Sequence, residues 1–568
     1  MLVRIRISRR RRVHASAQPV AAGRSASAPS LAVDPHQPAK PRLALGASSR
    51  VALGILVSRL TGLARERFIA HYFGLETVVA DAFRAAIRIP NLLGTLFGEG
   101  VLSAAFVTVY AKLRAAQQDE EAEHVAAAVF GILALVSSVL VLLAISFTPI
   151  FIDLVAPGFK HDERGALTIH LVRIVFAATG LSVLSAWCLG VLNSHRRFLL
   201  SYLAPVALNL TVIAALISFG RHSVPDRLVS DAAWAYVGGS ALQFLVQLPK
   251  VLEILPGFRP VLEWRSPHVR SVLRNFGPIF LSRGVVQISA YIDQMIASWL
   301  PKGAVAALFS GQVITILPIS LFSMSVSAAE LPMLSSAIGN EEEVAAFLRG
   351  RLSGGLRRIA FFIVPSAVAF LLLGDVLGAA LYQTGQFHHS DSVYLWSVLA
   401  GSAVGLLATS LGRLYSSAFY ALLDTRTPLR FAIVRVVLTT GLGLLFALQG
   451  PYWLGIDRKW GVAGLTASAG IAGWVEFALL RHALGQRIGK TPLSSGFVLK
   501  LWSAAFVGGC LGYLIKKGIG FAHPLLLAFL VLPVYAIVYF GGTLLLGINE
   551  SRTTIASVLR RVGLNFSF

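Results

Sequence analysis

Long apolar segments separated by short polar turns follow one another from about residue 50 to residue 547. Each is long enough to cross a bilayer as an α-helix, which needs about 20 residues. None shows the roughly ten-residue alternation of an outer-membrane barrel. We place about fourteen spans by this length rule, at 50–70, 80–112, 124–153, 166–193, 199–219, 231–253, 273–299, 303–336, 345–373, 392–422, 428–449, 460–484, 496–515 and 523–547. The pattern predicts an all-α polytopic membrane protein, because helices satisfy their own backbone hydrogen bonds in lipid.

Two stretches of the chain, roughly 230 residues apart, share a pattern typical of transporter repeats. APGF at 156–159 precedes a helix that ends near LNS at 192–194, and YQTGQF at 382–387 precedes a helix that ends at ALLDT, 421–425. Transporters often place their substrate site between two such halves. We therefore predict two six-helix lobes and two added helices. The boundaries are a tail at 1–48, an N-lobe at 49–255, a C-lobe at 256–490, helices thirteen and fourteen at 491–548 and a tail at 549–568.

Composition narrows the class of protein, and the charges of the loops predict its orientation in the membrane. A mean hydropathy of +0.71 excludes an ordinary soluble protein. The net charge of +23 does not indicate nucleic acid, because residues 1–50 alone hold ten Lys or Arg against Asp34 and resemble a disordered basic tail. Short loops such as 195–197 are basic, whereas 71–79 and 374–391 contain no Lys or Arg, which predicts both termini in the cytoplasm. Four residues break this bias: Lys160, Arg164, Lys516 and Lys517.

Charged residues within the first two spans are the strongest functional signal. Ionisable groups at membrane depth need a partner or a function. The polar positions there are Ser58, Arg59, Arg65, Glu66, Asp81, Arg84, Arg88, Asn91 and Glu99. Helical spacing puts Asp81, Arg84 and Arg88 on one stripe. A cationic interior predicts an anionic cargo. The alternative is that these residues form ion pairs between helices or, near the helix ends, reach the headgroups, and we favour this alternative for Arg84, Arg88 and Arg67.

Later segments add isolated charges and two prolines. Asp293 is a lone acid that either binds a cation or pairs with Arg283, and Arg413 and Arg435 either line the second lobe or reach the headgroups. Pro90 and Pro318 predict kinks in the two spans that contain them.

Sequence signatures of enzymes and metal sites are weak. GQRIGKT at 485–491 has one residue too few for a phosphate-binding loop and joins two apolar helices. The His388-His389 pair lacks ligands at metal spacing, and Cys188 and Cys510 are far apart in apolar segments, so we predict that both cysteines are packing residues. We therefore expect no enzyme, no metal and no bound cofactor.

The opening helices resemble those of the MurJ (MviN) family of lipid II flippases, in the polysaccharide and multidrug exporter superfamily. The matching stretches are SRLTGLARE (58–66), ADAF (80–83), RIPNLL (88–93), LFGEGVLSAAF (96–106), APGF (156–159) and FYALLDTRTP (419–428). The resemblance implies a fourteen-helix bacterial inner-membrane protein with a cationic cavity. It also implies that the last two helices form a groove for the lipid tail.

The same resemblance implies which residues bind the substrate and shows where this sequence differs from the family pattern. Arg59 and Arg65 match cavity arginines of the family, Ser58, Asp81, Asn91 and Glu99 match polar positions, and Glu66 replaces an Asp. Gly94 and Gln312 stand where the family commonly places arginines, so Arg88, Arg283 or Arg413 would supply replacement contacts.

These observations predict a flippase that moves lipid II by alternating access during peptidoglycan synthesis. The proposed substrate-binding residues are Ser58, Arg59, Arg65, Glu66, Asp81, Asn91, Glu99 and Arg283, with Asp293 as a cation or ion-pair site. Coupling to Na⁺ or to membrane potential stays open, and cell-wall polymerases are candidate partners. The alternatives are a flippase for another lipid-linked glycan, a cation-coupled multidrug exporter and a non-transporting cell-wall scaffold.

Overall fold

A computed structural model describes residues 45–97, 103–160, 162–337, 339–491, 493–520 and 523–561. Every segment predicted to span is largely helical over its described part, although the span at 124–153 is divided at Phe147 into two helices. The helices are α1 (Leu45–Phe73), α2 (Val78–Phe97), α3 (Thr108–Ala115), α4 (Asp119–Ser146), α5 (Thr148–Val155), α6 (Glu163–Ser194), α7 (Phe198–Phe219), α8 (Pro225–Ile254), α9 (Pro267–Ser298), α10 (Ala304–Pro318), α11 (Ser325–Ser335), α12 (Glu341–Tyr382), α13 (His389–Ala421), α14 (Arg426–Leu444), α15 (Gly450–Leu454), α16 (Gly461–Ile488), α17 (Ser495–Ile519), α18 (Pro524–Leu545) and α19 (Asn549–Arg561).

Short π and 3-10 helices mark the joints between some of these helices. They are η1 (Ser103–Val107), η2 (Pro157–Phe159), η3 (Ile319–Met324), η4 (Leu445–Gln449) and η5 (Arg458–Trp460). The kink predicted at Pro318 coincides with η3, because α10 ends at Pro318 and continues through this π-helix into α11. π-helical turns of this kind interrupt the regular helix ladder and are common at functional sites.

Within the described residues, ten helices are long and apolar enough to cross a membrane. They include α4, α6, α12, α13, α17 and α18. The chain is therefore a multi-pass membrane protein. The remaining predicted spans are helical as well, and the number of fourteen crossings stays a prediction.

In the N-terminal part, α6 packs against α2, α4 and α8. Trp187 of α6 is fully buried and its indole N–H donates to the carbonyl of Ala126 at 3.1 Å. The bond satisfies the polar end of a large buried aromatic side chain. Cys188 beside it is buried, as predicted, but Cys510 on α17 is exposed, so the prediction that both cysteines pack inside is wrong for Cys510. Position 510 faces outward because α17 packs through its glycines and alanines.

In the C-terminal part, α13 packs between α12 and α16. Close contact requires small residues: a Cβ on Gly405 of α13 would lie 2.2 Å from the Cα of Gly470 on α16. Side chains of small volume let membrane helices approach closely, which compensates for the absence of a hydrophobic driving force between helices in lipid. These helices form the rigid core of the predicted C-lobe.

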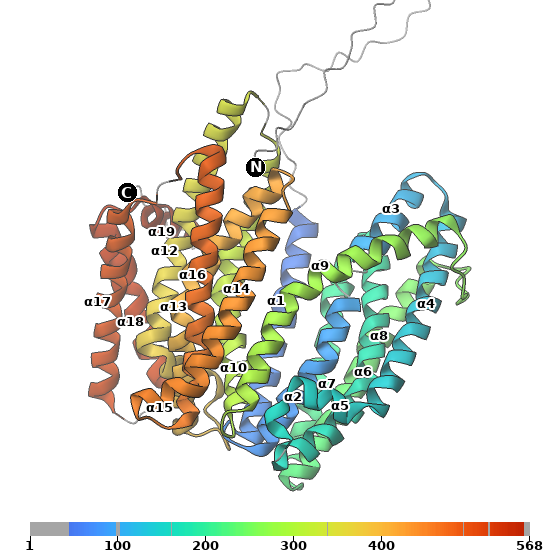
Figure 1. The fold of residues 1–568 in the computed structure, drawn as a ribbon, viewed down its shortest axis with the longest axis horizontal. Helices are drawn as coiled ribbons and strands as arrows, with labels where there is room; N and C mark the ends of the chain where they lie inside the picture. The colour runs from blue at the N-terminus through green and yellow to red at the C-terminus, as the bar shows by residue number, and fades with distance from the viewer. Residues whose placement is uncertain are drawn as a thin grey trace, which may run out of the picture. The chain divides into compact units, whose positions relative to one another are not determined.

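Helix α9 crosses from one part of the chain to the other (Figure 1). Its first turns place Val269 and Val272 in a core with residues of α4, α6 and α8. Its last turns place Ile296 and Ala297 in the core that includes α10 and α16. Helix α9 therefore belongs to the packing of both predicted lobes, and the boundary at residue 255 stays a prediction.

The last two long helices, α17 and α18, pack beside α12. Tyr535 and Tyr539 of α18 donate to the carbonyls of Pro365 at 2.6 Å and Phe361 at 2.5 Å in α12. Helix α19 is held to α12 by Arg357, whose Nε and Nη2 donate to the two oxygens of Glu550 at 2.5 and 3.1 Å. Leu499, Phe529 and Ile537 are exposed on α17 and α18, an apolar surface that suits lipid contact.

Candidate functional site

Three charged residues of α1 and α2, Arg65, Glu66 and Arg84, form a compact cluster. Glu66 Oε1 accepts from Arg65 Nε at 3.2 Å and Nη2 at 2.7 Å, and Glu66 Oε2 accepts from Arg84. The side chains of Glu66 and Arg84 are only 4% and 5% exposed. Arg84 also lies over the ring of Phe309 in α10, 4.7 Å from its centroid. The cluster confirms that Arg84 forms an ion pair between helices and shows that Arg65 is partly neutralised.

Arg59 differs from Arg65 in its surroundings. Its side chain is exposed, and the structure gives it no ion pair or hydrogen bond among the described residues. Arg59 therefore keeps its full charge and all five donors for a ligand. The structure does not join Arg59 to the Arg65 cluster, although both lie on α1.

Ser58 and Asn91 take part in polar contacts beside these arginines. The carbonyl of Ser58 accepts from the Thr61 hydroxyl at 3.0 Å. Asn91 Oδ1 accepts from the Tyr236 hydroxyl at 2.9 Å, which ties α2 to α8. Arg67, predicted to be structural, donates to the carbonyls of Ala380 at 2.7 Å and Leu381 at 3.0 Å, and so joins α1 to the end of α12.

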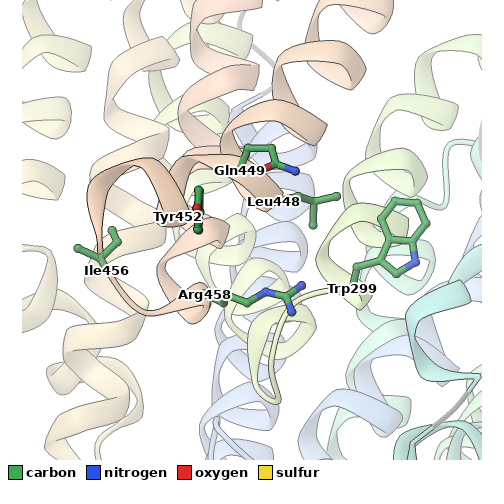
Figure 2. Close-up of a pocket in the computed structure, with 6 residues that line it drawn as sticks. All are labelled: Trp299, Leu448, Gln449, Tyr452, Ile456 and Arg458. Atoms are coloured by element: carbon green, nitrogen blue, oxygen red, sulfur yellow. The ribbon is translucent and has the colours of Figure 1, made fainter.

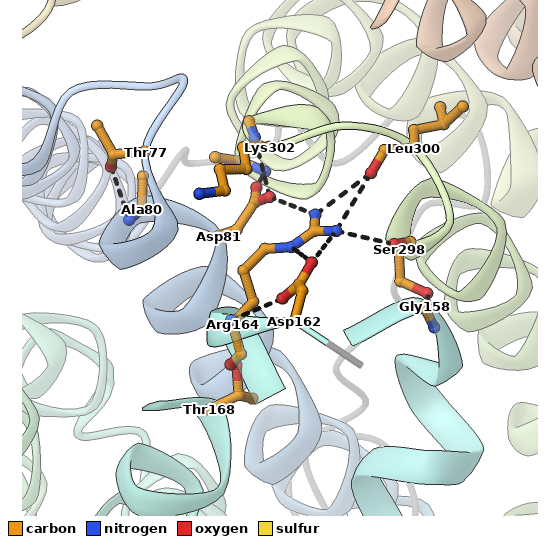
Figure 3. Close-up of polar contacts among 12 residues, drawn as sticks. Thr77, Ala80, Asp81, Gly158, Asp162, Arg164, Thr168, Ser298, Leu300 and Lys302 are labelled. Atoms are coloured by element: carbon orange, nitrogen blue, oxygen red, sulfur yellow. Dashed lines mark hydrogen bonds and ion pairs between the residues drawn. The ribbon is translucent and has the colours of Figure 1, made fainter. Parts of the chain in front are cut away.

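Asp81 lies in a separate network, which we call the clasp: Asp81, Asp162, Arg164 and residues 298–306 (Figure 3). Asp81 Oδ2 accepts from Arg164 Nη1 at 3.0 Å and from the Gly303 N–H at 2.9 Å, and Oδ1 accepts from the Ala306 N–H at 2.8 Å. Asp81 is 0% exposed. Its carboxylate therefore satisfies the free N–H groups at the start of α10, where negative charge is stabilised.

Arg164 completes the clasp from the start of α6. Its guanidinium also donates to Asp162 at 2.7 Å and to the carbonyls of Ser298 at 3.4 Å and Leu300 at 3.3 Å. It lies over the ring of Phe159 at 4.3 Å. The clasp thus connects α2 and α6 with the α9–α10 turn. Gly303 permits this turn, since its φ is +92° and a Cβ would lie 2.8 Å from the Cα of Glu76.

Three of the basic residues that break the charge bias are paired with carboxylates. Arg164 pairs with Asp81, Lys160 pairs with Asp153 at 2.7 Å, and Lys516 pairs with Asp375. A paired basic residue contributes little net positive charge to its loop. In the sequence, Arg164 stands out only as an exception to the charge bias, and this exception is the one signal that points toward its role in the clasp.

A second polar region is a cavity of about 250 Å³ in the predicted C-lobe. Asp293, Gln312, Arg413 and Arg435 line it together with residues of α10, α13 and α16. Arg435 Nη1 donates to Glu476 at 3.1 Å, whereas Arg413 is exposed to the cavity and has no ion pair among the described residues. Asp293 Oδ1 is buried and has no hydrogen-bond partner in the described part of the chain. Of the two alternatives for Arg413 and Arg435, the structure agrees with the one in which both line a cavity.

Several predicted residues lie beyond what the structure describes. Glu99 falls outside the described residues, as does most of the tail at 1–48. Gly94 and Arg283 lie in α2 and α9, but the side chain of Arg283 is not among those described. Their roles stay predictions.

Comparisons with known proteins bear on this arrangement. A family model described as Lipid II flippase MurJ matches residues 69–532. The chain belongs to this family. Among curated MurJ relatives, the lipid II flippase MurJ of Burkholderia cenocepacia is 34% identical over 463 residues, covering 80% of this chain and 86% of the relative. The probable lipid II flippase MurJ of Rhizobium tropici is 32% identical over 478 residues, covering 81% and 85%.

Two solved structures have a fold similar to that of this chain. A lipid II flippase MurJ in an inward closed conformation has a TM-score of 0.72 and 22% identity, covering 90% of this chain and 99% of that one. An inward-facing multidrug resistance MATE family transporter of the MOP superfamily has a TM-score of 0.58 and 18% identity, covering 78% and 98%. The fold of this MurJ family member is therefore shared with transporters of that superfamily.

Proposed function

We propose that this protein flips lipid II, the undecaprenyl-diphosphate-linked peptidoglycan precursor, across the bacterial inner membrane. The observation that carries the proposal is its membership of the MurJ family over residues 69–532. The relatives named as lipid II flippases cover most of its length. The protein would act as a transporter with no catalytic step of its own.

The charges give this proposal a physical basis. A diphosphate that leaves water needs compensating cations, and a guanidinium pairs with phosphate oxygens through two parallel hydrogen bonds. Arg59 and Arg413 have no ion-pair partner among the described residues, so neither must give up an existing bond to bind the diphosphate. The polyprenyl tail would remain in an apolar environment throughout.

Alternating access requires a contact that closes one end of the transporter. We assign this role to the clasp, because it joins α2 and α6 to the turn before α10. Two further links lie at the same end: Lys459 pairs with Glu76 at 3.4 Å, and the Gln386 N–H donates to the His71 carbonyl at 2.8 Å. The predicted orientation places this end outside, with both termini in the cytoplasm. Lipid II would then enter from the cytoplasmic leaflet.

Asp293 supports a cation-coupled variant of the cycle. Its Oδ1 is buried without a hydrogen bond among the described residues, in a cavity that also holds Arg413 and Arg435. A cation at Asp293 would give this buried oxygen a partner. Na⁺ coupling and a cycle driven by membrane potential are both compatible with this proposal, and cell-wall polymerases are its candidate partners.

The test replaces Arg59 by Ala in a bacterium depleted of its own lipid II flippase. We expect Arg59→Ala to abolish rescue of growth at normal membrane levels, because the substrate loses an unshared guanidinium. The matched control is Arg114→Ala, which removes an exposed arginine paired with Asp119 at 2.8 Å and should rescue fully. Full rescue by Arg59→Ala would contradict the assigned role.

A further inference from the structure

A second cavity lies in the predicted C-lobe, and none of its lining residues belongs to α1. It has a volume of about 620 Å³ and is lined by Trp299, Leu448, Gln449, Tyr452, Ile456 and Arg458 (Figure 2). These residues come from the end of α9, from η4 and α15, and from the turn that leads into η5. Figure 2 shows the Arg458 guanidinium on the side of the opening that faces Trp299. We call this cavity the rim pocket.

The surroundings of the rim pocket are apolar and exposed. Tyr452 is 82% exposed, Trp453 60% and Leu454 74%. Three consecutive large apolar residues would be unfavourable in water, whereas Trp and Tyr are enriched where a membrane meets water. The rim pocket also adjoins the clasp, since Trp299 lies between Ser298 and Leu300, whose carbonyls accept from Arg164. It therefore lies at a membrane boundary, at the end of the protein predicted to be outside.

The polar groups of the rim pocket lack partners among the described residues. No ion pair or hydrogen bond engages the side chains of Arg458, Gln449 or Trp299 in that part of the chain. The charges beside Arg458 are already engaged: Asp457 accepts from the Lys459 N–H at 2.9 Å, and the Lys459 ammonium pairs with Glu76. One guanidinium, one amide and one indole N–H thus remain as donors around an apolar wall.

We propose that the rim pocket binds the headgroup of an anionic phospholipid from the outer leaflet. Arg458 would pair with the phosphodiester, Gln449 and the Trp299 indole would donate to its remaining oxygens, and Leu448 and Ile456 would contact the glycerol and upper acyl chain. A single unpaired cation matches the single charge of a phosphodiester. A diphosphate carries more charge and would leave part of it uncompensated here. This site is separate from the proposed flipping and does not depend on it.

The test counts retained lipids on the purified full-length protein by native mass spectrometry, with phosphatidylglycerol or phosphatidylcholine added. We expect the wild type to bind one phosphatidylglycerol with about tenfold higher affinity than Arg458→Gln does, the usual scale of one charge-assisted hydrogen bond. Arg458→Lys keeps the charge but loses the planar fork, and should bind several-fold more weakly than the wild type.

The matched control is Lys160→Gln, which removes one positive charge from the same end outside both the rim pocket and the clasp, where Lys160 pairs with Asp153 at 2.7 Å. It should bind phosphatidylglycerol like the wild type. Thermal unfolding of each variant in the same detergent should be unchanged, because Arg458 is exposed. Three results would overturn the proposal: equal binding by Arg458→Gln and wild type, equal retention of phosphatidylcholine at this site, or displacement of phosphatidylglycerol by a polyprenyl diphosphate.

Discussion

The clasp and the arginines Arg59 and Arg413 differ in how completely their charges are paired. Asp81 accepts three hydrogen bonds at zero exposure, and Arg164 bonds to two carboxylates and two carbonyls. Arg59 and Arg413 are exposed and have no ion pair among the described residues. A fully paired charge at membrane depth holds helices together, whereas an unpaired one is available to a ligand. Asp81 and Arg164 are therefore structural residues, whereas Arg59 and Arg413 are candidates for ligand binding.

The largest expected effect comes from breaking the clasp with Asp81→Ala. Arg164 would keep Asp162 but lose its buried partner, and α10 would lose its cap. Removing one partner of a buried ion pair costs about 3–5 kcal/mol. We expect a lower melting temperature in detergent. We also expect faster maleimide labelling of a cysteine introduced at Ala306, which is 1% exposed, in a Cys510→Ser background.

The control for this experiment is Asp153→Ala, whose partner Lys160 is 54% exposed. Exposed pairs contribute little, about 0–1 kcal/mol. If Asp81→Ala melted and labelled like Asp153→Ala, the clasp would not hold the outer end closed.

The next effect is that of Glu66→Gln in the α1–α2 cluster. The amide accepts one hydrogen bond but cannot balance two arginines, so we expect a loss of about 2 kcal/mol in the free energy of unfolding. Glu163→Gln is the matched control, since Glu163 is 78% exposed and should shift stability by less than about 0.5 kcal/mol. If the two variants melted at the same temperature, Glu66 would not stabilise the contact between α1 and α2.

The C-lobe cavity allows a direct comparison of two arginines. We expect Arg413→Ala to weaken binding of lipid II by about 10- to 100-fold with an unchanged melting temperature, because Arg413 has no ion pair among the described residues. Arg435→Ala should instead lower the melting temperature, because Glu476, 15% exposed, would lose its cation. Isothermal titration and thermal unfolding in the same detergent measure both. If Arg413→Ala instead lowered the melting temperature and Arg435→Ala weakened lipid II binding, Arg435 and not Arg413 would be the ligand-binding residue.

The smallest effect concerns Asp424, in the turn between α13 and α14. Burial raises the pKa of Asp424, but hydrogen bonds from Thr427 and Arg487 outweigh it and hold this pKa at about 2, below the ordinary 3.8. A depressed pKa means that the stabilisation is present above pH 3.8 and is lost as the pH falls through 2.

Because Arg487 is 46% exposed, we expect Asp424→Asn to cost only about 1 kcal/mol at pH 7. Chemical unfolding at pH 7 measures this loss. A neutral or stabilising effect of Asp424→Asn would show that the turn is held by its backbone alone.

Much of the fold could be predicted from the sequence, because lipid forces each apolar segment into a helix and the turns between them are polar. The structural roles of Arg84 and Arg67 also followed from the cost of charge at membrane depth, although Arg67 bonds to backbone carbonyls and not to a carboxylate. The clasp could not be predicted, since Asp81 and Arg164 are far apart in the chain and helical periodicity gives a residue's face but not its neighbour. Arg65 was assigned to the substrate, yet Glu66 turns out to engage it within the same helix.

The most direct test of the proposed function is leaflet-resolved labelling of lipid II in proteoliposomes that contain this protein. We predict that lipid II placed in one leaflet becomes accessible in the other with the wild type but not with Arg59→Ala, and that an ordinary phospholipid crosses no faster than in protein-free liposomes. Absence of lipid II transfer by the wild type, or equal transfer of both lipids, would contradict the account.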